Sequence, residues 1–405
     1  MNLRNNYKFT VAGCYFGYIV QGVILSFLPL LYVQLNGEFS ISYDKISIII
    51  TITFLLQLLI DVFSTGFVTK LGYRKCLVAS STCALIGFIG LCFLPYHMDA
   101  FTGIIISVLF YSTGCGLIEV LISPLVEACP TKNKTAHMCL LHSFYCWGLL
   151  FTVLVSTAYF ALFGIENWRW LALGWAVLPF MNVFIFLFCP IYTADEEGKT
   201  VPPKALVKNK TVWLVIALMF LGGCAEVSIS QWMSVFVETG LNIPKDYCDL
   251  LGTCIFAACM GVSRVGFGLL SNKMRLERLL AAASFAAVIG YLMIGLSPYA
   301  WLSIAGCALC GFSTAVLWPA TLSFGSKTIP EGGTSLFAFM ALGGDLGCVI
   351  GPSAVGFIAD GTSIQMGILS GVVFPLALFI LFTVIIAKKS FFGKKDGGLP
   401  LDRPQ

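Results

Sequence analysis

Residues 191–210, IYTADEEGKTVPPKALVKNK, form the longest polar stretch between apolar segments of the chain. An acidic run, a Pro-Pro pair and several lysines are typical of a solvated linker. Six long apolar stretches precede this segment and six follow it. The sequence therefore predicts an N-terminal half, 1–190, and a C-terminal half, 211–390, joined by a cytoplasmic linker, 191–210, and followed by a cytoplasmic tail, 391–405.

The composition of the 405-residue chain excludes a water-soluble globule. Apolar residues make up 58% of the chain and charged residues only 11%, with a mean hydropathy of +0.91. A soluble domain carries about 25% charged residues, and these residues supply most of a water-exposed surface. Soluble enzymes, nucleic-acid-binding proteins and disordered chains are therefore excluded, and an integral membrane protein embedded in the lipid bilayer is predicted.

Twelve apolar stretches are long enough to cross a bilayer, because a helix needs about 20 apolar residues to span about 30 Å of hydrocarbon. Isolated strands would leave backbone groups unpaired in lipid, so each stretch is expected to be helical. The predicted fold class is all-α, with twelve transmembrane helices in two pseudo-symmetric six-helix bundles. The stretches lie near 8–34, 43–69, 74–96, 101–128, 135–163, 168–190, 211–239, 247–270, 276–297, 300–323, 333–359 and 364–387.

Lysine and arginine residues gather on one side of the predicted membrane. With both termini in the cytoplasm, only Lys45, Arg169 and Lys245 fall outside, Arg264 falls within a span, and the other Lys and Arg residues face the cytoplasm. Short cytoplasmic loops carry an excess of positive residues. We therefore expect a multi-pass protein of the cell membrane with both termini cytoplasmic.

The two halves contain similar sequence motifs at corresponding positions. The segment 116–124 (GLIEVLISP) in the fourth span shares its Gly-to-Pro spacing with 311–319 (GFSTAVLWP) in the tenth. A Thr and a Gly recur at equal spacing in spans five and eleven, and basic loops follow spans two and eight. Repeated halves with a site at their interface are the architecture of secondary transporters. The repeat predicts transport by alternating access.

The motifs of the chain resemble those of the major facilitator superfamily. The loop 65–74 (TGFVTKLGYR) is similar to that superfamily's Gly-x-x-x-Asp-Arg-x-Gly-Arg-Lys signature, with Thr69 in place of the acid. The segment 119–124 (EVLISP) is similar to the Glu-x-x-x-Asn-Pro element of fucose-permease-like sugar/proton symporters, and 142–148 (HSFYCWG) to their Gln-Ala-Phe-Asn-Ser-Phe-Gly element. This resemblance implies proton-coupled uptake of a neutral sugar or polyol.

Ionisable residues within the spans are the first candidates for the site. Each costs at least about 2.5–3.5 kcal/mol to insert, and such residues usually face the protein interior or a water-filled path. Glu119 and His142 lie on the two arms of one helical hairpin, each on the order of 17 Å from the turn between them. We expect Glu119 to couple protons and contact substrate, and His142 to bind substrate or share the proton. Glu226 is the corresponding acid of the second half, with the same two roles.

Three neutral residues are expected to complete the substrate site. Gln21 lies in the first span, and Ser123 lies one helical turn from Glu119. Trp318 is the repeat partner of Ser123 in the tenth span. Side-chain amides hydrogen-bond sugar hydroxyls, and an aromatic face packs against the C–H side of a sugar ring. For every acid named above, the alternative is a structural hydrogen bond between helices.

Five charged residues are predicted to form gates or ion pairs. Arg264 cannot lose its proton, so it requires a carboxylate partner. Asp61 and Asp345 are the expected partners, and direct binding of an anionic substrate by Arg264 is the alternative. Glu127, at the inner end of the fourth span, is expected to form a salt bridge with the basic loops that include Arg74.

Motifs for catalysis or cofactor binding are not found in the sequence. It contains no phosphate-binding loop and no His-Glu-x-x-His pattern, and its three His residues are dispersed. We therefore expect no enzyme, no metal, no cofactor and no nucleic-acid partner. The expected partners are a small sugar-like solute and protons, with a monomer sufficient for function. A proton-coupled drug or metabolite efflux antiporter, an organic-anion exchanger that uses Arg264, and a non-transporting scaffold remain alternatives.

Overall fold

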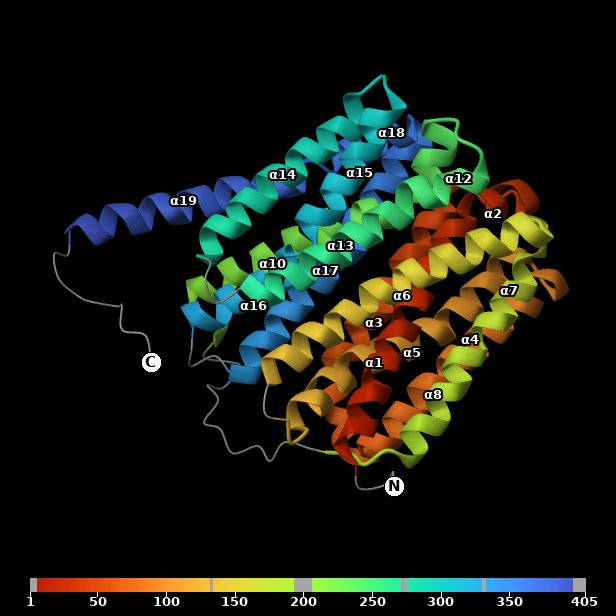
Figure 1. The fold of residues 1–405 in the computed structure, drawn as a ribbon, viewed down its shortest axis with the longest axis horizontal. Helices are drawn as coiled ribbons and strands as arrows, with labels where there is room; N and C mark the ends of the chain where they lie inside the picture. The colour runs from red at the N-terminus through yellow and green to blue at the C-terminus, as the bar shows by residue number, and fades with distance from the viewer. Residues whose placement is uncertain (1–5, 132–133, 193–205, 271–274, 330–332, 396–405) are drawn as a thin grey trace.

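The computed structural model is helical throughout its described part (Figure 1). Twelve of its helical segments are long and apolar enough to cross a membrane. The predicted all-α class with twelve spans is therefore confirmed. The structure describes residues 6–131, 134–192, 206–270, 275–329 and 333–395.

The first six spans are joined by short turns. Gly72 separates α3 from α4 with φ of +86°, a left-handed conformation that glycine adopts without steric cost. The elements in chain order are α1 (Tyr7–Phe27), η2 (Leu28–Leu31), α2 (Tyr32–Phe39), α3 (Tyr43–Leu71), α4 (Tyr73–His97), α5 (Ala100–Ala128), α6 (Lys134–Phe163), η3 (Ile165–Asn167), α7 (Trp168–Trp175) and α8 (Val177–Phe188).

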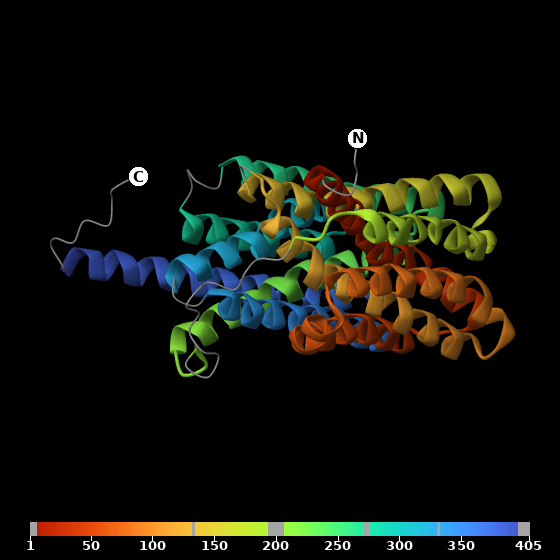
Figure 2. The ribbon, with the colours of Figure 1, turned by 90° about the horizontal axis from the view of Figure 1, so that it is seen from below.

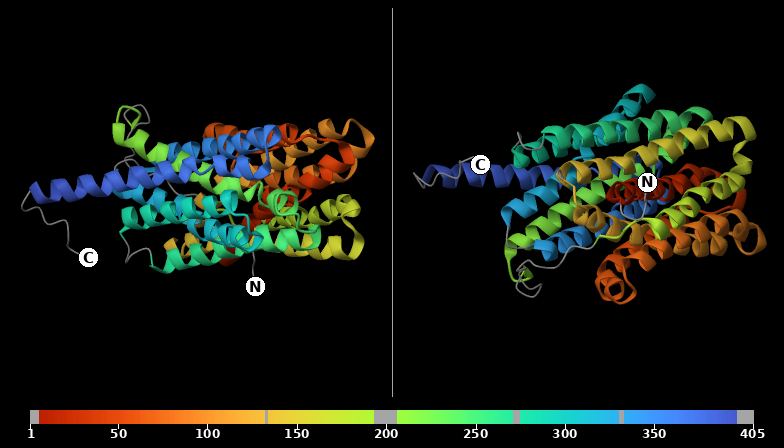
Figure 3. Two further views of the ribbon diagram at one scale, coloured as in Figure 1. Left: turned by 90° about the horizontal axis from the view of Figure 1, so that it is seen from above. Right: turned by 60° about the horizontal axis from the view of Figure 1, so that its bottom comes forward.

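The last six spans contain more interruptions than the first six. Their final helix, α19, projects beyond the other helices in two separate views (Figure 2 and Figure 3). The elements in chain order are α10 (Lys210–Ser230), α11 (Met233–Val235), η4 (Phe236–Gly240), α12 (Lys245–Asp249), η5 (Leu250–Cys254), α13 (Ile255–Leu270), α14 (Leu276–Leu296), α15 (Ala300–Thr314), α16 (Leu317–Thr328), α17 (Gly333–Gly361), α18 (Ile364–Ser370) and α19 (Val373–Lys395).

The first and seventh spans are interrupted at equivalent positions. Both α1 and α10 end after 21 residues, at Phe27 and Ser230 respectively. In the first span Pro29 follows, and its missing N–H favours the short 3-10 segment η2. Interrupted helices in corresponding positions of two halves are typical of the binding region of secondary transporters.

The two groups of six spans meet mainly along α3 with α17 and α6 with α13. Gly356 on α17 permits the first of these contacts, because an added Cβ would lie 1.8 Å from the Ser47 Oγ on α3. The Oγ1 of Thr51 and the Oγ of Ser353 form a hydrogen bond of 2.5 Å between the same helices. We call the end of the bundle where α1 begins and α19 ends the terminal face, and the end carrying α2, α12 and α18 the opposite face (Figure 1).

The predicted boundaries of the two halves cannot be followed through the linker. Residues 193–205 of the linker and 396–405 of the tail lie outside the described residues. The division into 1–190, 191–210 and 211–390 therefore stays a prediction.

Candidate functional site

The first six spans bring four of the predicted site residues together. Gln21 on α1 donates from Nε2 to the Oε2 of Glu119 on α5 at 3.1 Å. Ser123, one turn along α5, forms a 3.0 Å hydrogen bond with the hydroxyl of Tyr18. The Tyr18 ring meets the His142 ring of α6 edge-on, with centroids 5.4 Å apart. Tyr18, which no sequence motif singled out, therefore links the two arms of the predicted site.

Glu119 and Gln21 keep some hydrogen-bonding capacity for a ligand. Gln21 is only 4% exposed, and its Oε1 has no hydrogen-bond donor among the described residues. Glu119 is half-buried, and its Oε2 accepts the hydrogen bond from Gln21. An amide oxygen and a carboxylate are acceptors for hydroxyl groups. In the described structure His142 does not hydrogen-bond Glu119, and the predicted proton sharing between them stays a prediction.

The Arg264 guanidinium is paired, but with a different acid from the two expected. Its Nη2 lies 2.8 Å from the Oε1 of Glu226, and both side chains are about 90% buried. The expectation that Asp61 or Asp345 is the partner is therefore wrong. Glu226 lies on α10 and Arg264 on α13, both in the same half, whereas the two aspartates lie on α3 and α17. The guanidinium carbon also lies 5.7 Å from the ring centroid of Tyr145, on α6 of the other half.

Arg264 has a second partner, a backbone carbonyl oxygen that a proline leaves without its helical donor. In a continuous helix the N–H of residue 319 would bond the carbonyl of Ala315, but Pro319 has no N–H. The helix is broken there, between α15 and α16. The Nε of Arg264 donates to the Ala315 oxygen at 3.2 Å. A buried cation thus gains a carbonyl partner that the local sequence releases.

A second proline leaves a free carbonyl oxygen near the opposite face, and there a side chain of the other half bonds it. Pro29 leaves the carbonyl of Leu25 without its helical donor, and the Nε2 of Gln231 donates to that oxygen at 3.3 Å. The Oε1 of Gln231 accepts from the Tyr32 hydroxyl, also at 3.3 Å. Trp232 packs edge-on against Tyr43, with centroids 6.0 Å apart. The interrupted first and seventh spans therefore contact each other and close this side of the bundle.

Asp61 and Asp345 meet across the two halves. A side-chain hydrogen bond joins them, and Glu119 lies within electrostatic range of both. Two carboxyl groups form such a bond only when one of them carries a proton. Asp345 is 6% exposed, so the pair is shielded from water on that side. Within the described part of the chain, no group of three or more His, Cys, Asp or Glu side chains is placed to hold a metal ion.

Trp318 and Arg74 make contacts other than those described so far. Trp318 is half-buried and packs its indole against Gly344 of α17. Arg74 donates from Nη1 to the carbonyl oxygens of Phe186 and Leu187, at 2.9 and 2.7 Å, and so caps the end of α8. The side chain of Glu127 lies outside the described residues, and its salt bridge stays a prediction.

A small cavity lies between the two halves beside Glu226. Its volume is about 30 Å³, which suffices for one or two water molecules and is too small for a sugar. A solute of that size therefore requires the halves to move apart. The lining residues are Leu25, Ser26, Pro29, Phe54, Tyr145, Leu149, Glu226, Val227, Ser230, Gln231, Thr253, Phe256, Ala257 and Met260.

The bonds made by Gln231 are expected to hold the opposite face closed. Gln231→Ala removes both, and at about 1 kcal/mol for each hydrogen bond the ratio of open to closed molecules should rise about 30-fold. Spin labels at the exposed positions Glu166 and Tyr299, one on each half, would report this as a larger long-distance population. Gln34→Ala is the matched control, because the Gln34 amide bonds within the first half only. Identical distance distributions for Gln231→Ala and the control would contradict the assignment.

Comparison with known proteins decides the family. Residues 14–352 match the Major Facilitator Superfamily. The chain belongs to this superfamily. The superfamily predicted from the sequence is thereby confirmed, whereas the likeness to fucose-permease-like symporters stays a prediction.

Individual members of the superfamily are only distantly similar. An uncharacterised MFS-type transporter of Yersinia pestis is 22% identical over 234 residues, which span 56% of this chain and 59% of that relative. A bacterial homologue of the human lysosomal transporter Spinster, solved in an inward-facing and occupied conformation, has a TM-score of 0.74 at 12% identity, covering 97% of this chain and 99% of that one. The human organic anion transporter MFSD10 (TETRAN) has a TM-score of 0.69 at 15% identity, covering 94% and 100%. These structures share the fold with this chain.

Proposed function

We propose that this protein is a secondary transporter that takes up a neutral sugar or polyol together with protons by alternating access. An excess of carboxyl groups at the centre of the bundle carries the proposal. Asp61, Glu119, Glu226 and Asp345 lie there with one arginine, Arg264, which is already paired with Glu226. Ionised carboxylates without partners are too costly in such an interior, so part of this group must hold protons. Groups that gain and lose protons at the interface of two moving halves are suited to proton coupling.

The two central glutamates have different tasks in this proposal. Glu119, half-buried and held by Gln21, takes up the coupling proton and accepts a hydroxyl of the solute. Ser123 and His142 contribute further polar contacts from the same half. Glu226, which lines the cavity, serves as the second protonation site. Binding of solute and proton must favour the closed state differentially, because otherwise no coupling results.

Trp318 is proposed to contact the solute, and the five charged residues predicted as gates or ion pairs are proposed to control the gates. Trp318 would pack against the solute ring once the halves separate. The Arg264–Glu226 pair within the second half and the Asp61–Asp345 pair between the halves would both stabilise the arrangement described here. Arg74, with Glu127, would fix the terminal face.

We place the terminal face in the cytoplasm of a cell-membrane protein, because Lys and Arg residues gather there. The contacts of Gln231 and Trp232 then close the external side. The bacterial Spinster homologue of the same fold was solved in an inward-facing conformation. A single chain carries both halves of the site, which is consistent with function as a monomer.

Uptake into proteoliposomes tests the proposal. The purified protein is reconstituted and supplied with radiolabelled neutral sugars and polyols, with and without an inward proton gradient. The proposal predicts accumulation of at least one solute above its external concentration only when the gradient is present. Accumulation of no solute in the panel, together with gradient-driven efflux of lipophilic drugs, would instead favour the antiporter.

The Asp61–Asp345 pair supplies a stability test that needs no solute. Asp345→Asn retains a hydrogen-bond donor to Asp61, and we expect its thermal stability to stay close to wild type. Asp345→Ala removes the partner of a buried carboxyl, and it should lower the free energy of unfolding by about 1–3 kcal/mol. Thermal unfolding in detergent, followed by tryptophan fluorescence, measures both variants. Equal melting temperatures for the Asn and Ala variants would contradict a hydrogen bond at this position.

Organic-anion exchange is a second candidate function. Arg264 is a buried cation at the interface of the halves, in contact with Tyr145 of the other half. If Glu226 became protonated, the guanidinium would be available to an anionic solute. MFSD10 is an organic anion transporter of the same fold. Exchange of a labelled organic anion that is independent of a proton gradient, and that is lost when Arg264→Met is combined with Glu226→Gln so that neither charge is left unpaired, would favour this candidate.

A further inference from the structure

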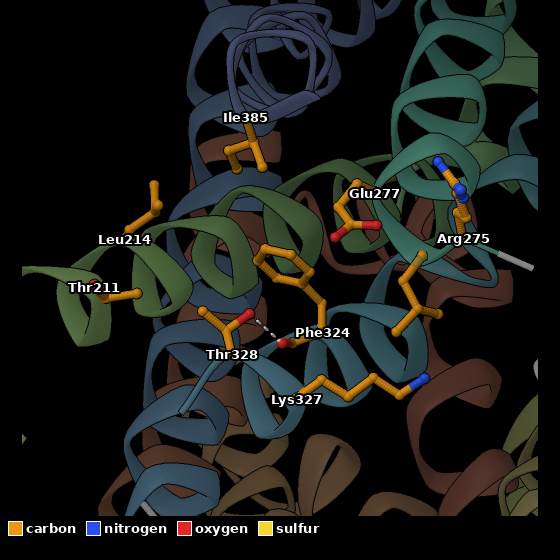
Figure 4. A pocket seen from close by; sticks show the side chains of 9 residues that line it. Thr211, Leu214, Arg275, Glu277, Phe324, Lys327, Thr328 and Ile385 are labelled. Atoms are coloured by element: carbon orange, nitrogen blue, oxygen red, sulfur yellow. Dashed lines mark hydrogen bonds between the residues drawn. The ribbon is translucent and has the colours of Figure 1, made fainter. Parts of the chain in front are cut away.

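A second and larger cavity lies at the terminal face, among the last six spans and away from Glu226. Its volume is about 490 Å³, and residues of α10, α14, α16 and α19 surround it (Figure 4). These helices begin or end at this level: α10 begins at Lys210, α14 at Leu276, and α16 ends at Thr328. The cavity therefore lies where the bundle meets the membrane–water boundary.

The rim of the cavity is basic. Arg275 and Lys327 both line it and both are exposed, and in Figure 4 their charged ends lie at the same end of the cavity. Glu277 is the one acid in the lining. Two cations against one acid give a net positive charge, which attracts an anionic group from the membrane surface.

The floor of the cavity is apolar. Leu214, Phe324 and Ile385 line it from α10, α16 and α19, and Phe324 is buried. The helix α19 also presents large apolar side chains at the protein surface, among them Val384, next to Ile385 in sequence, at 45% exposure. An apolar floor beside a lipid-facing helix, below a basic rim, matches an amphiphile with a charged head and hydrocarbon chains. A small water-soluble anion would leave the apolar floor unused.

We propose that this cavity binds the headgroup of an anionic phospholipid. The phosphate lies between the Arg275 guanidinium and the Lys327 ammonium, and the first carbons of the acyl chains contact Leu214 and Ile385. Basic pockets between membrane helices on the cytoplasmic side are suited to such headgroups. The site is independent of which solute the central cavity carries, although it requires the terminal face to be the cytoplasmic one or to border an anionic leaflet.

Bound lipid would connect four helices that carry or adjoin the central site. Glu226 lies farther along α10, and Trp318 lies at the start of α16. A headgroup that holds α10, α14, α16 and α19 together at their ends would stabilise the arrangement described here. The stability of the protein should therefore depend on anionic lipid even without solute.

Lipid titration of the full chain tests the proposal. The purified protein is titrated with phosphatidylglycerol or phosphatidylcholine of identical acyl chains, and bound lipid is counted by native mass spectrometry alongside the melting temperature. We expect phosphatidylglycerol to bind more tightly and to raise the melting temperature. Arg275→Gln with Lys327→Gln should weaken that binding roughly 30-fold, since each basic residue near an anionic surface contributes about fivefold.

Two controls separate this cavity from general surface charge. Arg278→Gln with Lys388→Gln removes the same charge from exposed positions outside the lining, and binding should stay within about threefold of wild type. Leu214→Trp narrows the apolar part of the cavity without changing its charge, and it should also weaken phosphatidylglycerol binding. Equal losses in the two charge-removing variants, or unchanged binding in Leu214→Trp, would overturn the site. An equal rise in melting temperature with inorganic phosphate would overturn the lipid assignment.

Discussion

Glu119→Gln is expected to abolish accumulation of solute against its gradient while leaving exchange of solute in place. Gln keeps the size of Glu119 and can still bond Gln21, but it cannot gain or lose a proton. Uptake driven by an inward proton gradient should therefore fall to the equilibrium level, which is a tenfold loss if the wild-type protein accumulates solute tenfold. Counterflow, which needs no net proton movement, should remain within a few-fold of wild type.

A matched control separates this effect from a general loss of negative charge. Glu166→Gln makes the same chemical change at an exposed position of the opposite face, and its accumulation should equal that of wild type. If Glu119→Gln still accumulates solute under the gradient, the coupling role moves to Glu226. If both accumulation and counterflow disappear, Glu119 is required for binding rather than for coupling alone.

Arg264→Met is expected to have the largest effect on stability. It leaves the Glu226 carboxyl, about 90% buried, without its partner at 2.8 Å. Breaking a buried ion pair from one side costs about 3–5 kcal/mol, because the remaining charge stays desolvated. The loss should appear as a lower melting temperature in detergent and a smaller folded fraction after purification.

The double variant Arg264→Met with Glu226→Gln distinguishes a broken pair from lost packing. Removing both charges is expected to restore most of the stability, since replacement of a whole buried pair by neutral residues is often close to neutral. Transport should stay impaired, because the second protonation site is gone. A double variant no more stable than Arg264→Met would show that the arginine acts through other contacts, such as those with Ala315 and Tyr145.

Composition and hydropathy were enough to predict the fold. A bilayer accepts backbone only as satisfied helices or closed barrels, so long apolar runs leave little choice of structure. The chain distance from Glu119 and His142 to their common turn also placed them at one depth. Depth along a helix follows from residue counting. Which side chain touches which depends on helix rotation, and here Tyr18 and Gln21 provide the contacts.

The ion pairs were harder to predict than the helices. The spans contain several acids that could pair with Arg264, and only the folded structure shows that Glu226 of α10 is the one that reaches it. Asp61 and Asp345 meet because α3 crosses α17 between the halves, and no local sequence pattern encodes such a distant contact.

The prolines within the spans could nevertheless have indicated where polar side chains of other helices bind the backbone. Pro29 and Pro319 each release the carbonyl four residues earlier. Polar side chains of other helices, Gln231 and Arg264, occupy those two oxygens. Searching a membrane sequence for such released carbonyls would have drawn attention to both helix breaks.

Proton movement driven by the solute tests the central claim most directly. Proteoliposomes without any initial gradient receive an outside pulse of a solute that they accumulate, while a membrane-impermeant dye reports the external pH. The account predicts that the external medium becomes more alkaline as solute and protons enter together, and that Glu119→Gln liposomes show no such change. Solute entry in the wild-type liposomes at an unchanged external pH would contradict the account.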